Sequence, residues 1–203
     1  MLGRAISHFF PSSIADRDAL AAFVAREAAY LAQRSTYEFT RNALAWHGQA
    51  AFGDAAFNDA FRICRWEAFA ATLSAFCALA FAHLAPAAGG RRAGLEAAIV
   101  ALYAEILAGH EAPRHRDGWS EAVAGLAESL RRIMPGTVPT AAEMIRDAAA
   151  LIHAKMPVQA GNDREELEVI ANALRFGTIG YADRLVRRLR PPETIASLLP
   201  PRR

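Results

Sequence analysis

The chain of 203 residues has a formal net charge of +2, is 53% hydrophobic and is 22% charged. The hydrophobic fraction excludes a disordered chain, and so small a net charge gives no support to nucleic-acid binding. The length is sufficient for one compact domain, so we expect a single domain over residues 1–203. Alanine occurs 47 times. Because alanine favours helices and is depleted from strands, the composition predicts an all-α fold.

The first half of the chain predicts two long helices joined by a short turn. A helical pattern begins at Asp16 and continues to about His47, and a second covers residues 55–85 without Gly or Pro. Residues 48–54, which lie between them, are typical of a turn. We therefore expect a long antiparallel helical hairpin.

Beyond the hairpin, Gly and Pro divide the chain into pieces of helix length. Apolar side chains recur at intervals of three and four in four of these pieces, over residues 92–109, 119–133, 140–156 and 163–190. Thr140 and Glu143 have the spacing of a capping box, which predicts a helix start. The sequence thus predicts a bundle of six or seven helices, with a short, loosely held tail after about residue 191.

The two cysteines lie on the same predicted helix. Cys64 and Cys77 are 13 residues apart, which corresponds to about 20 Å along a helix and is too far for a disulfide. We expect both to be reduced thiols in the core. The first 15 residues lack the uninterrupted apolar run of a secretory leader, so the expected location is the cytoplasm.

Residues 68–85 contain no charged side chain and are just long enough to cross a membrane. However, eight of these 18 residues are alanine, which contributes little to insertion. The large side chains Trp66, Phe69, Leu73 and Phe76 also keep to one face. We therefore predict a buried central helix and no transmembrane span.

A polar stripe on the first helix is the main candidate for a binding site. Tyr30, Arg34, Tyr37, Glu38 and Arg41 follow one another at steps of three or four. Antiparallel pairing in the hairpin is expected to bring this stripe near arginines and a tryptophan of the second helix. The predicted ligand-binding residues are Tyr37, Glu38, Arg41, Arg62, Arg65 and Trp66.

Guanidinium groups, a carboxylate and aromatic rings together can hold a small anion or a lipid headgroup. The alternative is that Glu38 and Glu67 neutralise Arg41, Arg62 or Arg65 as ion pairs between helices, or that the whole set is a solvated face.

Other chemistry is weakly supported by the sequence. A polar loop could hold a metal through His110, Glu111, His115 and Asp117, but loop polarity explains the same residues, so we expect no metal and no cofactor. Cys64 is the most plausible nucleophile, yet a cysteine in an alanine-rich helix usually behaves as a small hydrophobe. A catalytic role is therefore not expected.

The C-terminal part of the chain is basic. Its arginines Arg184, Arg187, Arg188 and Arg190 form a surface that could attach to an anionic membrane or an acidic partner. A solvated helix end, with cations that complement the helix dipole, is the alternative.

Three functions follow from these patterns. The first is a non-catalytic helical interaction protein that self-associates or binds another protein, because alanine-rich faces allow close helix packing. The second is a protein that binds an anionic small molecule or lipid headgroup, with possible catalysis, at the polar stripe. The third is peripheral membrane association through the basic C-terminal helix. No nucleic-acid partner is expected.

Overall fold

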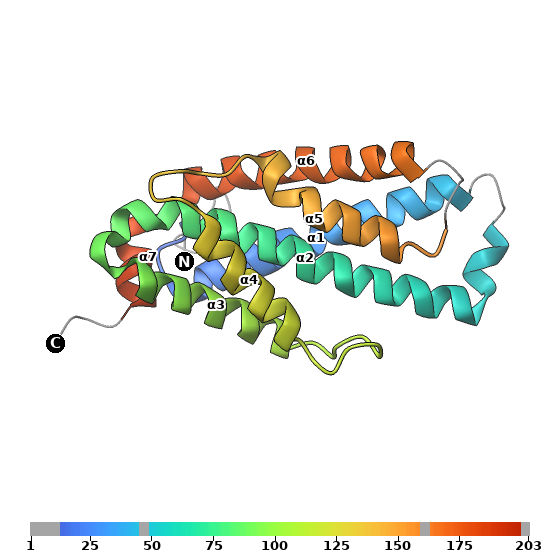
Figure 1. Ribbon diagram of the computed structural model, residues 1–203, viewed down its shortest axis with the longest axis horizontal. Helices are drawn as coiled ribbons and strands as arrows, with labels where there is room; N and C mark the ends of the chain where they lie inside the picture. Colours follow the sequence, from blue (N-terminus) through green and yellow to red (C-terminus); the bar gives the residue numbers. More distant parts are fainter. Residues whose placement is uncertain (1–12, 45–48, 159–162, 200–203) are drawn as a thin grey trace, which may run out of the picture.

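The computed structural model describes residues 13–44, 49–158 and 163–199, and these residues form seven α-helices and no strand (Figure 1). The helices are α1 (Arg17–Leu44), α2 (Ala55–Ala88), α3 (Arg92–Ala108), α4 (Ser120–Arg132), α5 (Ala141–Lys155), α6 (Asp163–Arg188) and α7 (Pro191–Leu198). Short 3-10 helices precede α2 and α3. The predicted all-α bundle is confirmed.

Helix α2 lies in the middle of the bundle and contacts each of the other six helices. It runs antiparallel to α1, as predicted for the hairpin (Figure 1); residues 45–48 of the connection lie outside the described residues. Nearly every side chain between residues 67 and 82 is buried. Because many of them are alanine, neighbouring helices can approach α2 closely from several sides.

Two buried tyrosines show how close this approach is. The Tyr103 hydroxyl of α3 donates to the Ala70 carbonyl at 3.0 Å, and the Tyr181 hydroxyl of α6 donates to the Phe76 carbonyl at 2.8 Å. The Tyr181 ring also stacks on the Phe76 ring, with centroids 3.7 Å apart. Each phenol therefore reaches the backbone of α2 and satisfies its hydroxyl inside the core.

Helix boundaries are set by local hydrogen bonds. Asp54 caps α2 by accepting from the Phe57 amide at 2.8 Å. The predicted capping box is confirmed at α5, where the Thr140 amide donates to Glu143 at 2.7 Å and the Glu143 amide donates back to Thr140 at 3.3 Å. Helix α2 continues through Pro86, beyond the predicted end, and stops where Gly89 adopts a φ of 53°.

The segment after residue 191 differs from the predicted loose tail. Pro191 and Pro192 begin helix α7, because proline lacks an N–H that the first turn leaves unpaired in any case. Thr194, Ile195 and Leu198 are buried. The Thr194 hydroxyl donates to the Ile14 carbonyl at 2.9 Å, so α7 is tied to the start of the described chain.

Helix α6 continues without interruption through Gly177 and Gly180. Its Gly177 lies against Leu31 of α1, and a β-carbon at this position would collide with the Leu31 side chain. Glycine at 177 is therefore required by the close approach of two helices.

Among the described residues, one stretch, Ala55–Ala108, which comprises α2, the 3-10 helix after it and α3, is long and apolar enough to cross a membrane by length and composition. In its most apolar 18-residue window, 83% of the residues are buried inside the protein. Core helices pass the same test, and here the other helices cover the window, in agreement with the predicted central helix.

Substitution of two helical glycines should separate packing from helix propensity. A β-carbon at Gly125 of α4 would meet only open space, so Gly125→Ala should stabilise the protein by up to about 1 kcal/mol. Gly177→Ala gains the same propensity but overpacks Leu31, which costs roughly 1–3 kcal/mol. Chemical denaturation should show opposite signs for the two variants, and a stabilising Gly177→Ala would contradict the α1–α6 packing.

Candidate functional site

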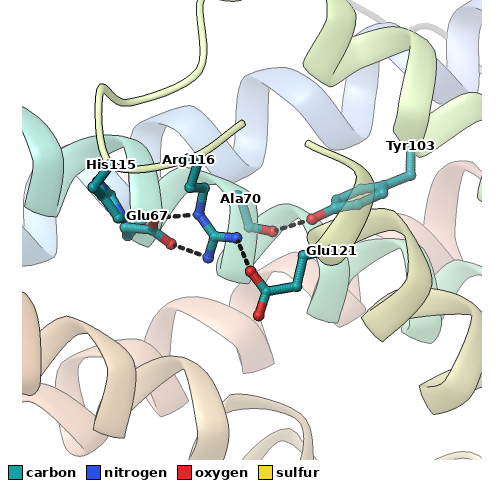
Figure 2. A network of polar contacts seen from close by, with 6 residues as sticks. All are labelled: Glu67, Ala70, Tyr103, His115, Arg116 and Glu121. Carbon is teal, nitrogen blue, oxygen red and sulfur yellow. Dashed lines mark hydrogen bonds and ion pairs between the residues drawn. The ribbon is translucent and has the colours of Figure 1, made fainter. Parts of the chain in front are cut away.

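A buried carboxylate on α2 is the centre of a cluster of polar contacts. Glu67 is only 1% exposed, and Arg116 from the loop between α3 and α4 donates to both of its oxygens, at 2.5 and 2.9 Å (Figure 2). His115 Nε2 lies 2.8 Å from the same carboxylate. Arg116 also bonds Glu121 at 2.8 Å. We refer to Glu67, His115 and Arg116 as the Glu67 cluster.

The Glu67 cluster keeps a charge inside the protein. Burial by itself would raise the pKa of the Glu67 carboxyl, but the hydrogen bonds and charge of Arg116, together with His115, outweigh burial and lower that pKa. Glu67 is therefore ionised at neutral pH, and the pKa of Arg116 is raised by its hydrogen bond to Glu67. A bidentate, charge-assisted pair of this kind fixes the loop onto α2.

The same loop carries an aromatic contact at its other end. The His110 ring lies 5.0 Å from the Trp66 ring and 5.4 Å from the Phe69 ring, both of α2. Trp119 Nε1 donates to the His110 carbonyl at 3.1 Å, which closes the loop on itself. The Glu67 cluster and this bond together hold His110 over the aromatic side chains of α2.

Between this loop and α1 lies a cavity of about 370 Å³. It is lined by Ala29, Ala32, Gln33, Arg62, Arg65, Trp66, Phe69 and His110. A second cavity of about 240 Å³ shares Arg62 and Trp66 with it and extends under the loop toward Arg114. We call the first one the loop cavity. Its wall combines aromatic rings with two guanidinium groups and includes no carboxylate.

The structure brings together only part of the predicted ligand-binding set. Arg62, Arg65 and Trp66 share the loop cavity. Tyr37 and Arg41 are exposed on α1 and line none of the three cavities described here. The α1 members of the predicted set therefore do not share the loop cavity with its α2 members.

Glu38 lies on the side of α1 away from the loop cavity and pairs with Arg34 at 3.0 Å. Both line a cavity of about 420 Å³ between α1 and α6. In the same wall, the buried Ser35 hydroxyl has no hydrogen-bond partner among the described residues. Across this cavity, Glu27 pairs with Arg184 at 2.5 Å and joins the two helices.

The exposed face of α6 is unexpectedly apolar. Four large side chains there are each more than half exposed: Val169 (51%), Phe176 (68%), Ile179 (51%) and Val186 (56%). On a helix of 3.6 residues per turn they fall within an arc of about 100°, opposite the buried Leu174 and Leu185. Helix α6 thus has two apolar faces, and only one is covered.

The C-terminal arginines do not share one surface. Arg184 pairs with Glu27, and Arg187 pairs with Asp183 at 2.7 Å. The Arg188 guanidinium lies 4.9 Å from the centre of the Phe23 ring, toward the core, whereas Arg190 is exposed. Membrane attachment through these arginines stays a prediction.

The structure also places the other candidate chemical groups. Both cysteines are buried and free, and burial, with the nearby charge of Glu67, raises the pKa of the Cys64 thiol to about 12. Cys64 is therefore protonated at neutral pH and is a poor nucleophile. Over the described residues, no group of three or more His, Cys, Asp or Glu is arranged to hold a metal ion.

The sequence interpretation missed the partner of Glu67. It considered Arg62 and Arg65, which are close in sequence, whereas the structure supplies Arg116 from 49 residues away. The sequence does indicate that Glu67 is buried, because its carboxylate lies on the apolar side of the second helix, next to Cys64 and Ala68. A buried carboxylate requires a cation, but the sequence does not say which loop provides it.

Comparison of the chain with protein-family models, with curated proteins and with solved structures finds no match.

Removal of Arg116 should destabilise the fold strongly. Arg116→Ala leaves the buried Glu67 carboxylate without its main partner, which costs roughly 3–5 kcal/mol in denaturant unfolding. Because folding lowers the pKa of Glu67, its contribution is present above about pH 4.5 and is lost as the pH falls. The difference between wild type and Arg116→Ala should shrink on acidification.

The matched control is Arg114→Ala, an exposed arginine in the same loop, for which we expect a change within about 0.5 kcal/mol. Equal stability of the two variants at pH 7 would show that the Glu67 cluster contributes little to the fold.

Proposed function

We propose that this chain is a non-catalytic interaction protein that self-associates through helix α6. The observation that carries the proposal is the second apolar face of α6, formed by Val169, Phe176, Ile179 and Val186. Single exposed apolar residues are ordinary on protein surfaces, whereas several large ones on one helix face, here around the polar Asn172 and Asp183, are typical of an interaction site.

Tyr30 of α1 lies beside this apolar face. Tyr30 is 60% exposed and lines the same α1–α6 cavity as Phe176. Burying a large apolar side chain contributes about 1.5–3 kcal/mol, and part of this gain is offset by the entropy lost on association. The four residues of α6 are already partly buried, so each contributes only part of this gain, and we expect a weak complex that depends on protein concentration.

The protonation of Cys64, the most plausible nucleophile, supports a binding role over a catalytic one. The Cys64 thiol is buried in the core, where it contacts the Ile152 carbonyl and Met156. Its raised pKa removes the thiolate that covalent catalysis would need.

A charged residue introduced on the exposed α6 face should weaken self-association. We expect sedimentation equilibrium to give a concentration-dependent mass above one chain for wild type. In Phe176→Glu and Ile179→Glu, the buried charge in the interface should weaken the association at least about tenfold. Both positions are exposed, so the variants should fold, which circular dichroism can verify.

Val138→Glu is the matched control, because Val138 is 46% exposed but lies between α4 and α5. It should associate like wild type. A wild-type mass of one chain at every concentration would remove the proposal.

A second candidate function is the binding of a small aromatic anion or an anionic lipid headgroup in the loop cavity. The observation that favours it is the composition of the cavity wall, where Trp66, Phe69 and His110 offer stacking surfaces beside two arginines. Arg62 pairs with Asp59 at 2.5 Å, whereas Arg65 lies 6.0 Å from the centre of the Phe61 ring. The Arg65 guanidinium is thus available for charge-assisted bonds to an anion.

Arg65→Ala should weaken anion binding. A hydrogen bond to a charged group contributes about 1.5–3 kcal/mol, so we expect the Kd for benzoate to rise roughly tenfold or more in calorimetry. Arg41→Ala, which changes an exposed arginine of α1 outside the loop cavity, should bind like wild type.

Inorganic phosphate and vesicles with anionic lipid distinguish a free anion from a headgroup as the ligand source. Equal affinities of wild type and Arg65→Ala for all three probes would exclude this cavity as an anion site.

A further inference from the structure

On the exposed face of α6, the positions of the apolar residues are symmetric about the peptide bond between Gly177 and Thr178. Three pairs of exposed residues are equidistant from this midpoint, namely Val169 and Val186, Phe176 and Ile179, and Asn172 and Asp183. A two-fold contact requires a surface that is complementary to itself. A helix face with this symmetry matches a second copy of itself in the opposite direction.

We propose that two copies of this chain pack α6 against α6 in antiparallel orientation, centred on the midpoint between Gly177 and Thr178. Val169 and Phe176 are seven residues apart, and so are Ile179 and Val186, which is the spacing of a coiled-coil seam. In this register Phe176 of one copy lies level with Ile179 of the second copy. Each apolar side chain therefore meets an apolar side chain.

The polar residues Asn172 and Asp183 also fit this antiparallel register. Asn172 of one copy lies level with Asp183 of the second copy, so the asparagine amide can donate to the aspartate carboxylate. Asp183 already accepts from Arg187 at 2.7 Å, but a carboxylate has two oxygens and can accept from both groups. A parallel arrangement would instead oppose Asp183 to Asp183 and is disfavoured.

Charge along α6 favours the antiparallel arrangement as well. Among the exposed residues near the start of α6, Glu165 and Glu168 stand against Arg164, whereas near its end Arg184 and Arg187 stand against Asp183. Antiparallel packing places the acidic end of one helix beside the basic end of the other. Parallel packing places like charges together, which costs free energy and selects against that orientation.

The contact between the two α6 helices is short. The 18 residues from Val169 to Val186 cover only about 27 Å, so we expect a reversible dimer whose formation depends on concentration.

This inference rests on the proposed self-association, and cysteine cross-linking can test the register separately. In the antiparallel register, two copies of residue 169 are about 25 Å apart, beyond disulfide reach. Val169→Cys alone and Val186→Cys alone should therefore give no cross-linked dimer with an oxidant or a short bis-maleimide. A mixture of the two variants should give one. Cys64 and Cys77 are buried, so wild type serves as the unreactive control.

The outcomes separate the register from the proposed function. Cross-linking of Val169→Cys with itself would indicate parallel packing and overturn the inference, and a dimer by sedimentation with no cross-link in the mixture would also overturn it. In either case self-association itself survives. A single-chain mass at every concentration would remove both proposals.

A charge-swap cycle tests the polar pair. Asn172→Asp places two carboxylates level with each other at two symmetric contacts, so the Kd of the dimer should rise about tenfold or more relative to wild type. The double variant Asn172→Asp with Asp183→Asn restores an amide–carboxylate pair and should recover most of the association. Failure of the double variant to recover, beside an intact Val138→Glu control, would contradict the register.

Discussion

The packing of helix α2 on all of its sides is the constraint on which the rest of the structure depends. A helix in contact with six others has little surface left for solvent along its buried stretch, so most of its polar groups there depend on partners inside the protein. Alanine makes this possible, because it lets partners come close enough to bond the α2 backbone, as Tyr103 and Tyr181 do. The charged exception along this stretch is Glu67, a carboxylate that water cannot reach and that therefore determines where a loop must lie.

The Glu67 cluster links core stability to the geometry of a surface cavity. Arg116 stabilises the carboxylate from the loop, and the same loop presents His110 to Trp66 and Phe69. The energetic reason for the loop position is thus a buried charge, whereas its structural consequence is a preformed aromatic wall beside Arg62 and Arg65. A site held in this way needs little reorganisation when a ligand binds, which reduces the entropic cost of binding.

Much of the fold could be predicted because it depends on local signals. The 3.6-residue apolar period located the helices, and Thr140 with Glu143 located a helix start. The predictions that were wrong concerned features that depend on tertiary contacts. Pro191 was interpreted as the end of the ordered chain, although proline also suits a first helical turn, and only packing against Ile14 decides between the two. The polar stripe on α1 was real, but it lies on the side of α1 away from the loop cavity, so it does not meet Arg62, Arg65 and Trp66 of α2.

Helices α2 and α6 show why weak amphipathicity is ambiguous in a sequence. Both carry apolar residues on more than one face, and in α2 the apolar faces are covered by other helices of the same chain. In α6 the face with Leu174 and Tyr181 is covered, whereas the face with Phe176 is not. The burial of apolar side chains, which surrounds α2 with helices, is therefore incomplete on α6 within one chain. The opposite charges at the two ends of α6 favour an antiparallel orientation of the second helix that we propose to cover this face.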